Sequence, residues 1–126
     1  MKALVADDVP MIRKLIEFHL REMGFEVSSA ADGAEAVTLS SKAKFEIILL
    51  DLMMPVLSGL EVLKRIRSTG PNFDTPVIIL TADGTHNNVE TASHYAISSF
   101  LVKPVDQKLL RDKVTEALRQ RPPKEE

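Results

Sequence analysis

The stretch Ile47-Ile48-Leu49-Leu50-Asp51 decides the fold of this chain. Four apolar residues in succession are typical of a strand that is covered on both faces of a parallel sheet. The carboxylate that follows directly then lies at the end of a buried strand, where its burial costs free energy unless a cation or ligand compensates it. The stretch therefore predicts a central strand with Asp51 at its carboxyl end.

Further short runs and helical patterns extend on both sides of this strand. Apolar residues predict strands over residues 3–6, 77–80 and 100–102, and the more polar run 26–30 predicts an edge strand. Apolar residues at helical spacing and helix-ending signals predict helices over 10–23, 33–42, 59–68 and 106–119. Residues 85–95 are the weakest helix candidate, because the Asn, Ser and Thr residues there favour caps and turns.

The order of these elements is a strand followed by a helix, repeated five times. Such alternation predicts an α/β domain with a parallel sheet and helices on both of its faces. Right-handed crossovers restrict the topology to a few arrangements. In doubly wound sheets, ligands bind at the carboxyl ends of the strands, where the strand order reverses. The residues at those ends are therefore the candidates for a functional site.

Length and composition indicate one globular domain. The chain has 126 residues, of which 44% are hydrophobic and 27% charged, and its formal net charge is −2. The negative charge argues against a nucleic-acid-binding surface. The absence of cysteine excludes disulfides, thiolate metal sites and thiol catalysis. We expect a domain over residues 1–120, with the polar residues 121–126 as a tail or the start of a linker.

The apolar runs are too short for a membrane protein. None approaches the roughly 20 residues that a spanning helix needs. Residues 1–6 lack the long apolar stretch of a signal peptide and lead directly into acidic residues. We therefore expect a cytoplasmic protein without membrane contact.

Charged and hydroxyl side chains follow the expected strands. The residues concerned are Asp7 and Asp8 after the first strand, Asp51 after the third, Thr81 after the fourth and Lys103 after the fifth. Three carboxylates placed together repel one another unless a cation joins them. Mg²⁺ suits such a site because it takes one or two carboxylates and keeps several waters. Lys103 supplies a mobile positive charge that suits a phosphate oxygen.

These pieces, in this order and at these spacings, resemble the receiver domains of response regulators over nearly the whole chain. The resemblance rests on Asp7-Asp8, on Asp51 with Pro55 and Gly59 after it, on Thr81-Ala82, and on the residues 100–104. It implies a flavodoxin-like, doubly wound five-stranded parallel sheet with strand order 2-1-3-4-5 and five helices.

The resemblance also assigns roles around the expected phosphorylation site. Asp51 is implied to accept a phosphoryl group. Asp8, Asp51 and the backbone carbonyl of Met53 are implied to bind Mg²⁺ directly, while Asp7 acts mainly through water. Lys103 is implied to pair with the phosphoryl group.

Further roles concern the switch that follows phosphorylation. Thr81 is implied to donate its hydroxyl to the attached phosphoryl group, and Phe100 matches an aromatic position that turns inward in the active state. Ala82, Met53 and Asp83 neighbour the phosphoryl group, and the last two occupy positions that tune its hydrolysis in the family. A cis peptide before Pro104 is also expected from the resemblance.

The implied function is a phosphorylation-activated signalling switch rather than a turnover enzyme. A sensor histidine kinase or phosphotransfer protein would be the donor, and catalysis would be limited to the chain's own phosphorylation and slow dephosphorylation. Phosphorylation would change the face made by helix 4, strand 5 and helix 5 and so control an unknown protein target. We expect a monomer or a phosphorylation-dependent dimer. The chain either stands alone, which is the simpler interpretation, or is the input half of a longer regulator.

The first helix offers a possible docking surface for the donor. Met11, Leu15 and Phe18 lie along one edge of its broad apolar face, and charged residues fill the opposite side: Arg13, Lys14, Glu17 and Arg21. A departure from the family precedes the fifth strand: the family often has Gly-Ala before the aromatic residue, and this chain has Ala96-Ile97-Ser98-Ser99. Because alanine is restricted where glycine is not, this loop is expected to differ.

Three other functions compete with the switch. A flavodoxin-like electron carrier is disfavoured because Asp7 and Asp8 would repel a flavin phosphate. An aspartate-nucleophile phosphatase typically needs a second aspartate two residues after the nucleophile, where this chain has Met53. A receiver-like interaction module that takes no phosphate remains the alternative, although the complete set of acids, threonine and lysine argues against it.

Overall fold

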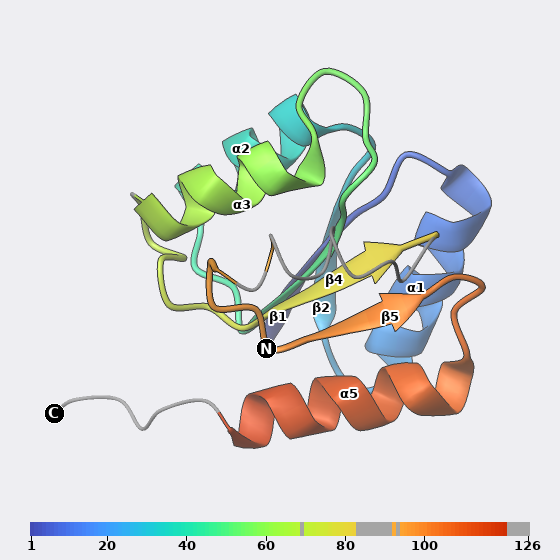
Figure 1. Ribbon diagram of the computed structural model, residues 1–126. Coiled ribbons are helices and arrows are strands. Elements are labelled where there is room, and N and C mark those ends of the chain that lie inside the picture. Colours follow the sequence, from blue (N-terminus) through green and yellow to red (C-terminus); the bar gives the residue numbers. More distant parts are fainter. Residues whose placement is uncertain (69, 83–91, 93, 121–126) are drawn as a thin grey trace, which may run out of the picture.

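The computed structural model describes residues 1–68, 70–82, 92 and 94–120 (Figure 1). Five strands and four helices follow one another in this part of the chain: β1 (Lys2–Ala6), α1 (Pro10–Glu22), β2 (Glu26–Ala30), α2 (Gly33–Lys42), β3 (Ile47–Asp51), α3 (Gly59–Ser68), β4 (Val77–Thr81), β5 (Ser99–Val102) and α5 (Gln107–Arg119). The helix expected over 85–95 falls mostly outside the described residues, as do Asp83 and the expected tail over 121–126.

The five strands form one parallel sheet in the order β2-β1-β3-β4-β5. The expected α/β class and strand order are thereby confirmed. The polar strand β2 lies at an edge, as its composition predicted. The fully buried strands β3 and β4 occupy interior positions. This order reverses direction between β1 and β3, the place where doubly wound sheets bind ligands.

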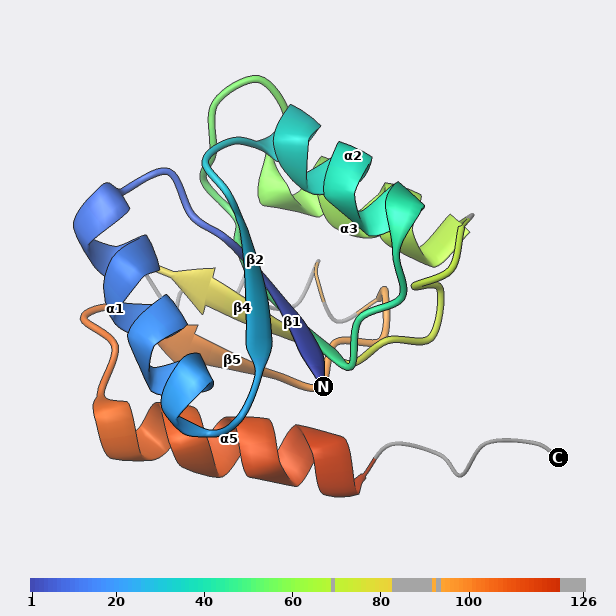
Figure 2. The ribbon, with the colours of Figure 1, turned by 180° about the vertical axis from the view of Figure 1, so that it is seen from behind.

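Helices cover both faces of the sheet, with α2 and α3 on one side and α1 and α5 on the other (Figures 1 and 2). Alternate residues of β3 point to opposite faces, so Ile48 and Leu50 pack in one core while Ile47 and Leu49 pack in the other. Both sets are fully buried. This explains why the sequence of β3 is continuously apolar instead of alternating.

Side-chain caps define where two helices begin. The Asp32 carboxylate accepts from the Glu35 backbone N–H at 2.8 Å at the start of α2. Asp106 accepts from the Leu109 backbone N–H at 2.8 Å and caps α5, as its position before the helix predicted. The caps satisfy N–H groups that a helix leaves unpaired at its first turn.

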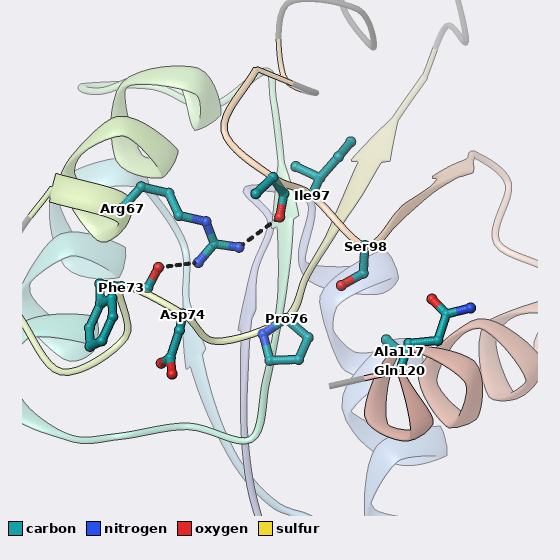
Figure 3. Close-up of a pocket in the computed structure, with 9 residues that line it drawn as sticks. Arg67, Phe73, Asp74, Pro76, Ile97, Ser98, Ala117 and Gln120 are labelled. Atoms are coloured by element: carbon teal, nitrogen blue, oxygen red, sulfur yellow. Dashed lines mark hydrogen bonds between the residues drawn. The ribbon is translucent and has the colours of Figure 1, made fainter. Parts of the chain in front are cut away.

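The loop that leads into β5 is fastened by Arg67 of α3. The Arg67 guanidinium donates from Nε to the Tyr95 carbonyl at 2.7 Å and from Nη2 to the Ala96 carbonyl at 3.1 Å. Its Nη1 donates to the carbonyls of Asn72 and Phe73 at 3.3 and 3.1 Å. Figure 3 shows the guanidinium in the wall of a pocket. The pocket is also lined by Phe73, Asp74, Pro76, Ala96, Ile97, Ser98, Ala117 and Gln120. One side chain therefore joins α3 to two separate loops.

Ala96 adopts a left-handed backbone conformation with φ of 59°, the region that glycine favours. Replacing Ala96 with glycine is therefore expected to raise the free energy of unfolding by about 0.5–1 kcal/mol, because the strain on the alanine backbone is relieved. Urea denaturation would measure the change.

The matched control is Ala34→Gly, at an exposed position in the first turn of α2, where the same chemical change should destabilise by up to about 1 kcal/mol, the cost in a helix interior. A loss of stability in both variants would contradict the assignment of strain to Ala96.

Candidate functional site

The ends of β3, β4 and β5 lie side by side at one edge of the sheet. The register pairs Asp51 with Leu80 and Thr81 with Val102. The Lys103 backbone N–H donates to the Thr81 carbonyl at 2.8 Å, so the polar residues after these strands continue the alignment. Backbone hydrogen bonds therefore bring residues that are far apart in the sequence together at this edge.

Lys103 lies between two buried carboxylates. Its Nζ is 2.9 Å from Asp51 Oδ2, to which it donates, and 2.8 Å from Asp7 Oδ2. The contact with Asp7 is a close ion pair whose geometry is outside that of a well-directed hydrogen bond. Asp51 Oδ1 accepts from the Met53 backbone N–H at 3.0 Å. Both oxygens of Asp51 are therefore held, and its carboxylate is fixed at the end of β3.

Burial and charge act in opposite directions on these groups. Burial raises the pKa of Asp51 above its usual range, and this effect outweighs the hydrogen bonds from Lys103 and Met53 that lower it. Burial alone would lower the pKa of Lys103, but its contacts with Asp51 and Asp7 outweigh burial and leave that pKa raised. Ionised Asp51 is therefore less favoured in this site than in water, whereas charged Lys103 is more favoured.

The three acids expected to bind metal do gather. Carboxylate oxygens of Asp7, Asp8 and Asp51 lie within 4.8 Å of one another. Asp8 is exposed, and its carboxylate forms no hydrogen bond or ion pair with the described part of the chain. Since three carboxylates face one lysine, the cluster keeps an excess of negative charge. Hard oxygen ligands with unneutralised charge fit Mg²⁺, which prefers oxygen ligands and needs few from the protein.

The remaining expected site residues lie on or next to β4 and β5. Thr81 is buried at the end of β4, and Ala82 is exposed beside it. The peptide between Lys103 and Pro104 is cis, as expected. Phe100 is partly exposed on β5 instead of packing in the core, and its inward turn stays a prediction.

One residue near the site was assigned wrongly from the sequence. Arg13 was placed on the solvent-facing side of the first helix, yet its side chain is only 17% exposed. Its Nη1 donates to the Asp7 backbone carbonyl at 2.8 Å. A helical projection cannot show this contact, because a long arginine side chain reaches back over the first turn of its own helix. The available signal was an arginine one turn into the helix that follows the two acids.

Comparison with known families assigns the class of protein that this fold and site define. Residues 3–115 match the family model described as the response regulator receiver domain. The chain therefore belongs to the response regulator receiver family of two-component signalling systems. Members of this family act as signalling switches, so the chain is a switch domain rather than a conventional enzyme.

Two relatives illustrate the match at the level of sequence. The chain is 38% identical over 125 residues to the response regulator protein PilR of Pseudomonas aeruginosa, covering 99% of this chain and 28% of PilR. It is 34% identical over 120 residues to the transcriptional regulatory protein GlrR of Escherichia coli, covering 95% of this chain and 27% of GlrR. The chain thus spans only about a quarter of these relatives, and 48% of a probable transcriptional regulator of Porphyridium aerugineum.

Solved structures agree with this family. A receiver domain of a sensor histidine kinase from Pseudomonas aeruginosa, with a magnesium ion coordinated in its active-site cleft, is 28% identical with a TM-score of 0.86. The alignment covers 94% of this chain and 98% of that one. The chemotaxis response regulator CheY4 of Vibrio cholerae is 32% identical with a TM-score of 0.86, and the alignment covers 92% of this chain and 97% of that one.

Among the described residues, no helix is long and apolar enough to cross a bilayer.

Proposed function

We propose that Asp51 accepts a phosphoryl group and that the domain is switched by this modification. The supporting observation is the arrangement of Asp51 beside Lys103 and within a cluster of three carboxylates. In the transfer, an Asp51 carboxylate oxygen forms a bond to phosphorus, and the bond from phosphorus to the donor's leaving group breaks. The electron pair of that bond departs with the donor. A carboxylate nucleophile of this kind occurs in enzymes that form aspartyl phosphate.

Mg²⁺ would be held by Asp8, Asp51 and the Met53 carbonyl, with Asp7 acting through water. When bound, it would supply positive charge against the negative charge of the phosphoryl group. Two observations support this assignment: the Asp8 carboxylate has no partner among the described residues, and the cluster has an excess of negative charge. Asp7 is already engaged with Lys103, which fits an indirect role.

Lys103 and Thr81 would receive the product. Lys103 already donates to Asp51 and can shift its contact to a phosphoryl oxygen, while Thr81 lies buried at the neighbouring strand end. A phosphoryl group adds roughly 1.5 to 2 negative charges if it ionises like other protein phosphates. That charge would draw the Thr81 hydroxyl inward and make room for Phe100. Ala82, Met53 and Asp83 would border the group, and Met53 and Asp83 would tune its hydrolysis.

The partners would be proteins. Met11, Leu15 and Phe18 are 80%, 44% and 55% exposed along α1, which begins beside the acidic cluster. This apolar edge would dock a histidine kinase or phosphotransfer protein that delivers the phosphoryl group. The output face would include Phe100 on β5, and the target would be a protein bound in a cytoplasmic setting. The domain would be a monomer or would dimerise when it is phosphorylated.

Incubation with acetyl phosphate, followed by intact-protein mass measurement, tests the proposal. The wild-type domain is expected to gain the mass of one phosphoryl group in the presence of Mg²⁺ and none after chelation. Asp51→Asn is expected to gain none, because the amide lacks the nucleophilic oxygen. Asp74→Asn, at an exposed residue remote from the cluster, should behave like the wild type.

The absence of any mass gain in a folded protein would contradict the proposed switch. It would favour a phosphate-independent interaction module and remove the roles given to Thr81, Phe100 and Lys103. An undiminished gain in Asp51→Asn would show that another residue accepts the group.

A further inference from the structure

The loop between β1 and α1 carries two of the three clustered acids, but it holds their side chains differently. Asp7 is buried, contacts Lys103, and accepts at Oδ1 from the Val9 backbone N–H at 2.9 Å. The Asp8 carboxylate is exposed and forms no hydrogen bond or ion pair with the described residues. The direction of Asp8 toward the other acids is therefore set by its backbone rather than by contacts of its side chain.

Arg13 contacts the peptide unit that joins these two acids. Its Nη1 donates to the Asp7 carbonyl oxygen at 2.8 Å, and its Nε lies 3.9 Å from a carboxylate oxygen of Glu17. Because a peptide group is planar, the Asp7 carbonyl and the Asp8 N–H belong to one rigid unit. A hydrogen bond to the carbonyl resists rotation of that unit and so restrains the direction in which the Asp8 side chain leaves the backbone.

Apart from the bond from the Val9 N–H to Asp7 Oδ1, the start of α1 supplies few other restraints on this loop. The residue at the N-cap is Val9, which makes no side-chain cap, and the first turn contains no acidic residue. The Asp7 backbone N–H donates to the Ala30 carbonyl at 3.1 Å, which holds the loop on its strand side. Arg13 supplies the corresponding contact from the helix side.

We propose that Arg13 is a positioning residue for the metal site: its hydrogen bond to the Asp7 carbonyl orients Asp8 toward the ion position shared with Asp51. This inference rests on the proposed binding of Mg²⁺. Groups that orient metal ligands through hydrogen bonds, without touching the metal, commonly change metal affinity by 10–100-fold when they are removed. Arg13 would therefore act on metal affinity rather than on the phosphoryl transfer itself.

The test is the Mg²⁺ dissociation constant, measured by calorimetry with Mg²⁺ alone on the wild type and on Arg13→Met. The variant is expected to bind roughly 10-fold more weakly. Arg21→Met is the matched control, because Arg21 lies on the same helix and also contacts Glu17, at 3.4 Å, but is exposed and far from the loop. Its dissociation constant should stay within about twofold of the wild type, since exposed pairs contribute little.

Two further measurements separate orientation from charge. A purely electrostatic effect of removing the arginine would tighten Mg²⁺ binding, because a positive charge near the acids is lost, and it would shrink at high ionic strength. A loss of orientation would instead weaken binding, and the weakening would persist at high ionic strength. The rate of phosphorylation by acetyl phosphate should also return to the wild-type maximum in Arg13→Met when Mg²⁺ is saturating. If Arg13→Met does not fold, Arg13→Lys, which keeps the charge but not the planar fork, takes its place.

The outcomes distinguish this inference from the function on which it rests. A folded wild-type domain that binds no Mg²⁺ would overturn the proposed metal site. A wild type that binds Mg²⁺ and an Arg13→Met variant that binds it equally well would overturn the role of Arg13 alone. An equal loss in Arg21→Met, or tighter Mg²⁺ binding by Arg13→Met, would also overturn it.

Discussion

Replacing Gly59 with alanine is expected to lower the free energy of unfolding by about 3 kcal/mol or more, the upper end of the range for overpacked positions. Gly59 is the first residue of α3 and is buried against the end of β3. A Cβ atom added there would overlap the Asp51 carbonyl oxygen and the Leu52 Cα. Both are backbone atoms, so no rotamer change can relieve the overlap. The Gly59 N–H also donates to the Leu52 carbonyl at 2.8 Å, which fixes this close approach.

Gly70→Ala provides the control for Gly59→Ala. Gly70 has φ of 93°, but an added Cβ there would have no neighbour within 4 Å. Its substitution should therefore cost only the strain of a left-handed alanine, about 1–2 kcal/mol. Chemical denaturation of both variants measures the difference. If Gly59→Ala were as stable as the wild type, the close approach of α3 to Asp51 would not be required by the fold.

Lys103→Met is expected to destabilise the metal-free domain by about 3–5 kcal/mol at neutral pH, the usual cost of breaking a buried ion pair from one side. The side chains of Asp7 and Asp51 are 0% and 3% exposed, so water cannot replace the lost cation. The exposed pair of Lys108 and Asp112, at 3.0 Å, supplies the control. Lys108→Met should change stability by less than about 1 kcal/mol.

The cost of removing Lys103 should depend on pH and on Mg²⁺. The pKa of Asp51 is raised in the folded protein, so its ionisation costs no stability below the unfolded value of 3.8 and its full cost is reached above the folded pKa. Without Lys103 that pKa should rise further. The destabilisation of Lys103→Met should therefore shrink as pH falls toward 4, and Mg²⁺ should reduce it at pH 7. A cost independent of both would contradict the electrostatic explanation.

The intact ion cluster makes a corresponding prediction at alkaline pH. The pKa of Lys103 is raised by its contacts with Asp51 and Asp7, which outweigh the lowering by burial. The stability that these contacts supply is fully present below the unfolded value of 10.5 and is lost as pH rises through the folded pKa. Alkaline unfolding curves of the wild type and Lys103→Met should therefore converge.

The sequence was sufficient for the strand and helix pattern because each interior strand has an apolar run long enough to be recognised. The apolar runs of β3 and β4 stop one residue before Asp51 and Thr81, while the backbone pairing continues through both residues. The gathering of the acids with Lys103 was predictable because parallel strands end at the same edge. Assigning their roles required the family resemblance.

Other contacts could not be predicted because they depend on the conformations of long, flexible side chains. Arg13 and Arg67 both look like solvent-facing residues of amphipathic helices, yet each donates to backbone carbonyls of a loop. A periodic pattern identifies which face of a helix is apolar, but it does not show which groups the guanidinium of a flexible arginine contacts. The left-handed conformation of Ala96 was hidden for a related reason, because alanine carries no signal for positive φ.

The division of β3 between two cores has a consequence for how such a domain can diversify. One set of its side chains supports α2 and α3, the other supports α1 and α5, and the polar end belongs to neither set. Substitutions on one side of the sheet can thus remodel a recognition surface while the opposite layer and the reactive edge keep their geometry. A regulator assembled in this way can acquire new partners on one layer without rebuilding its chemistry.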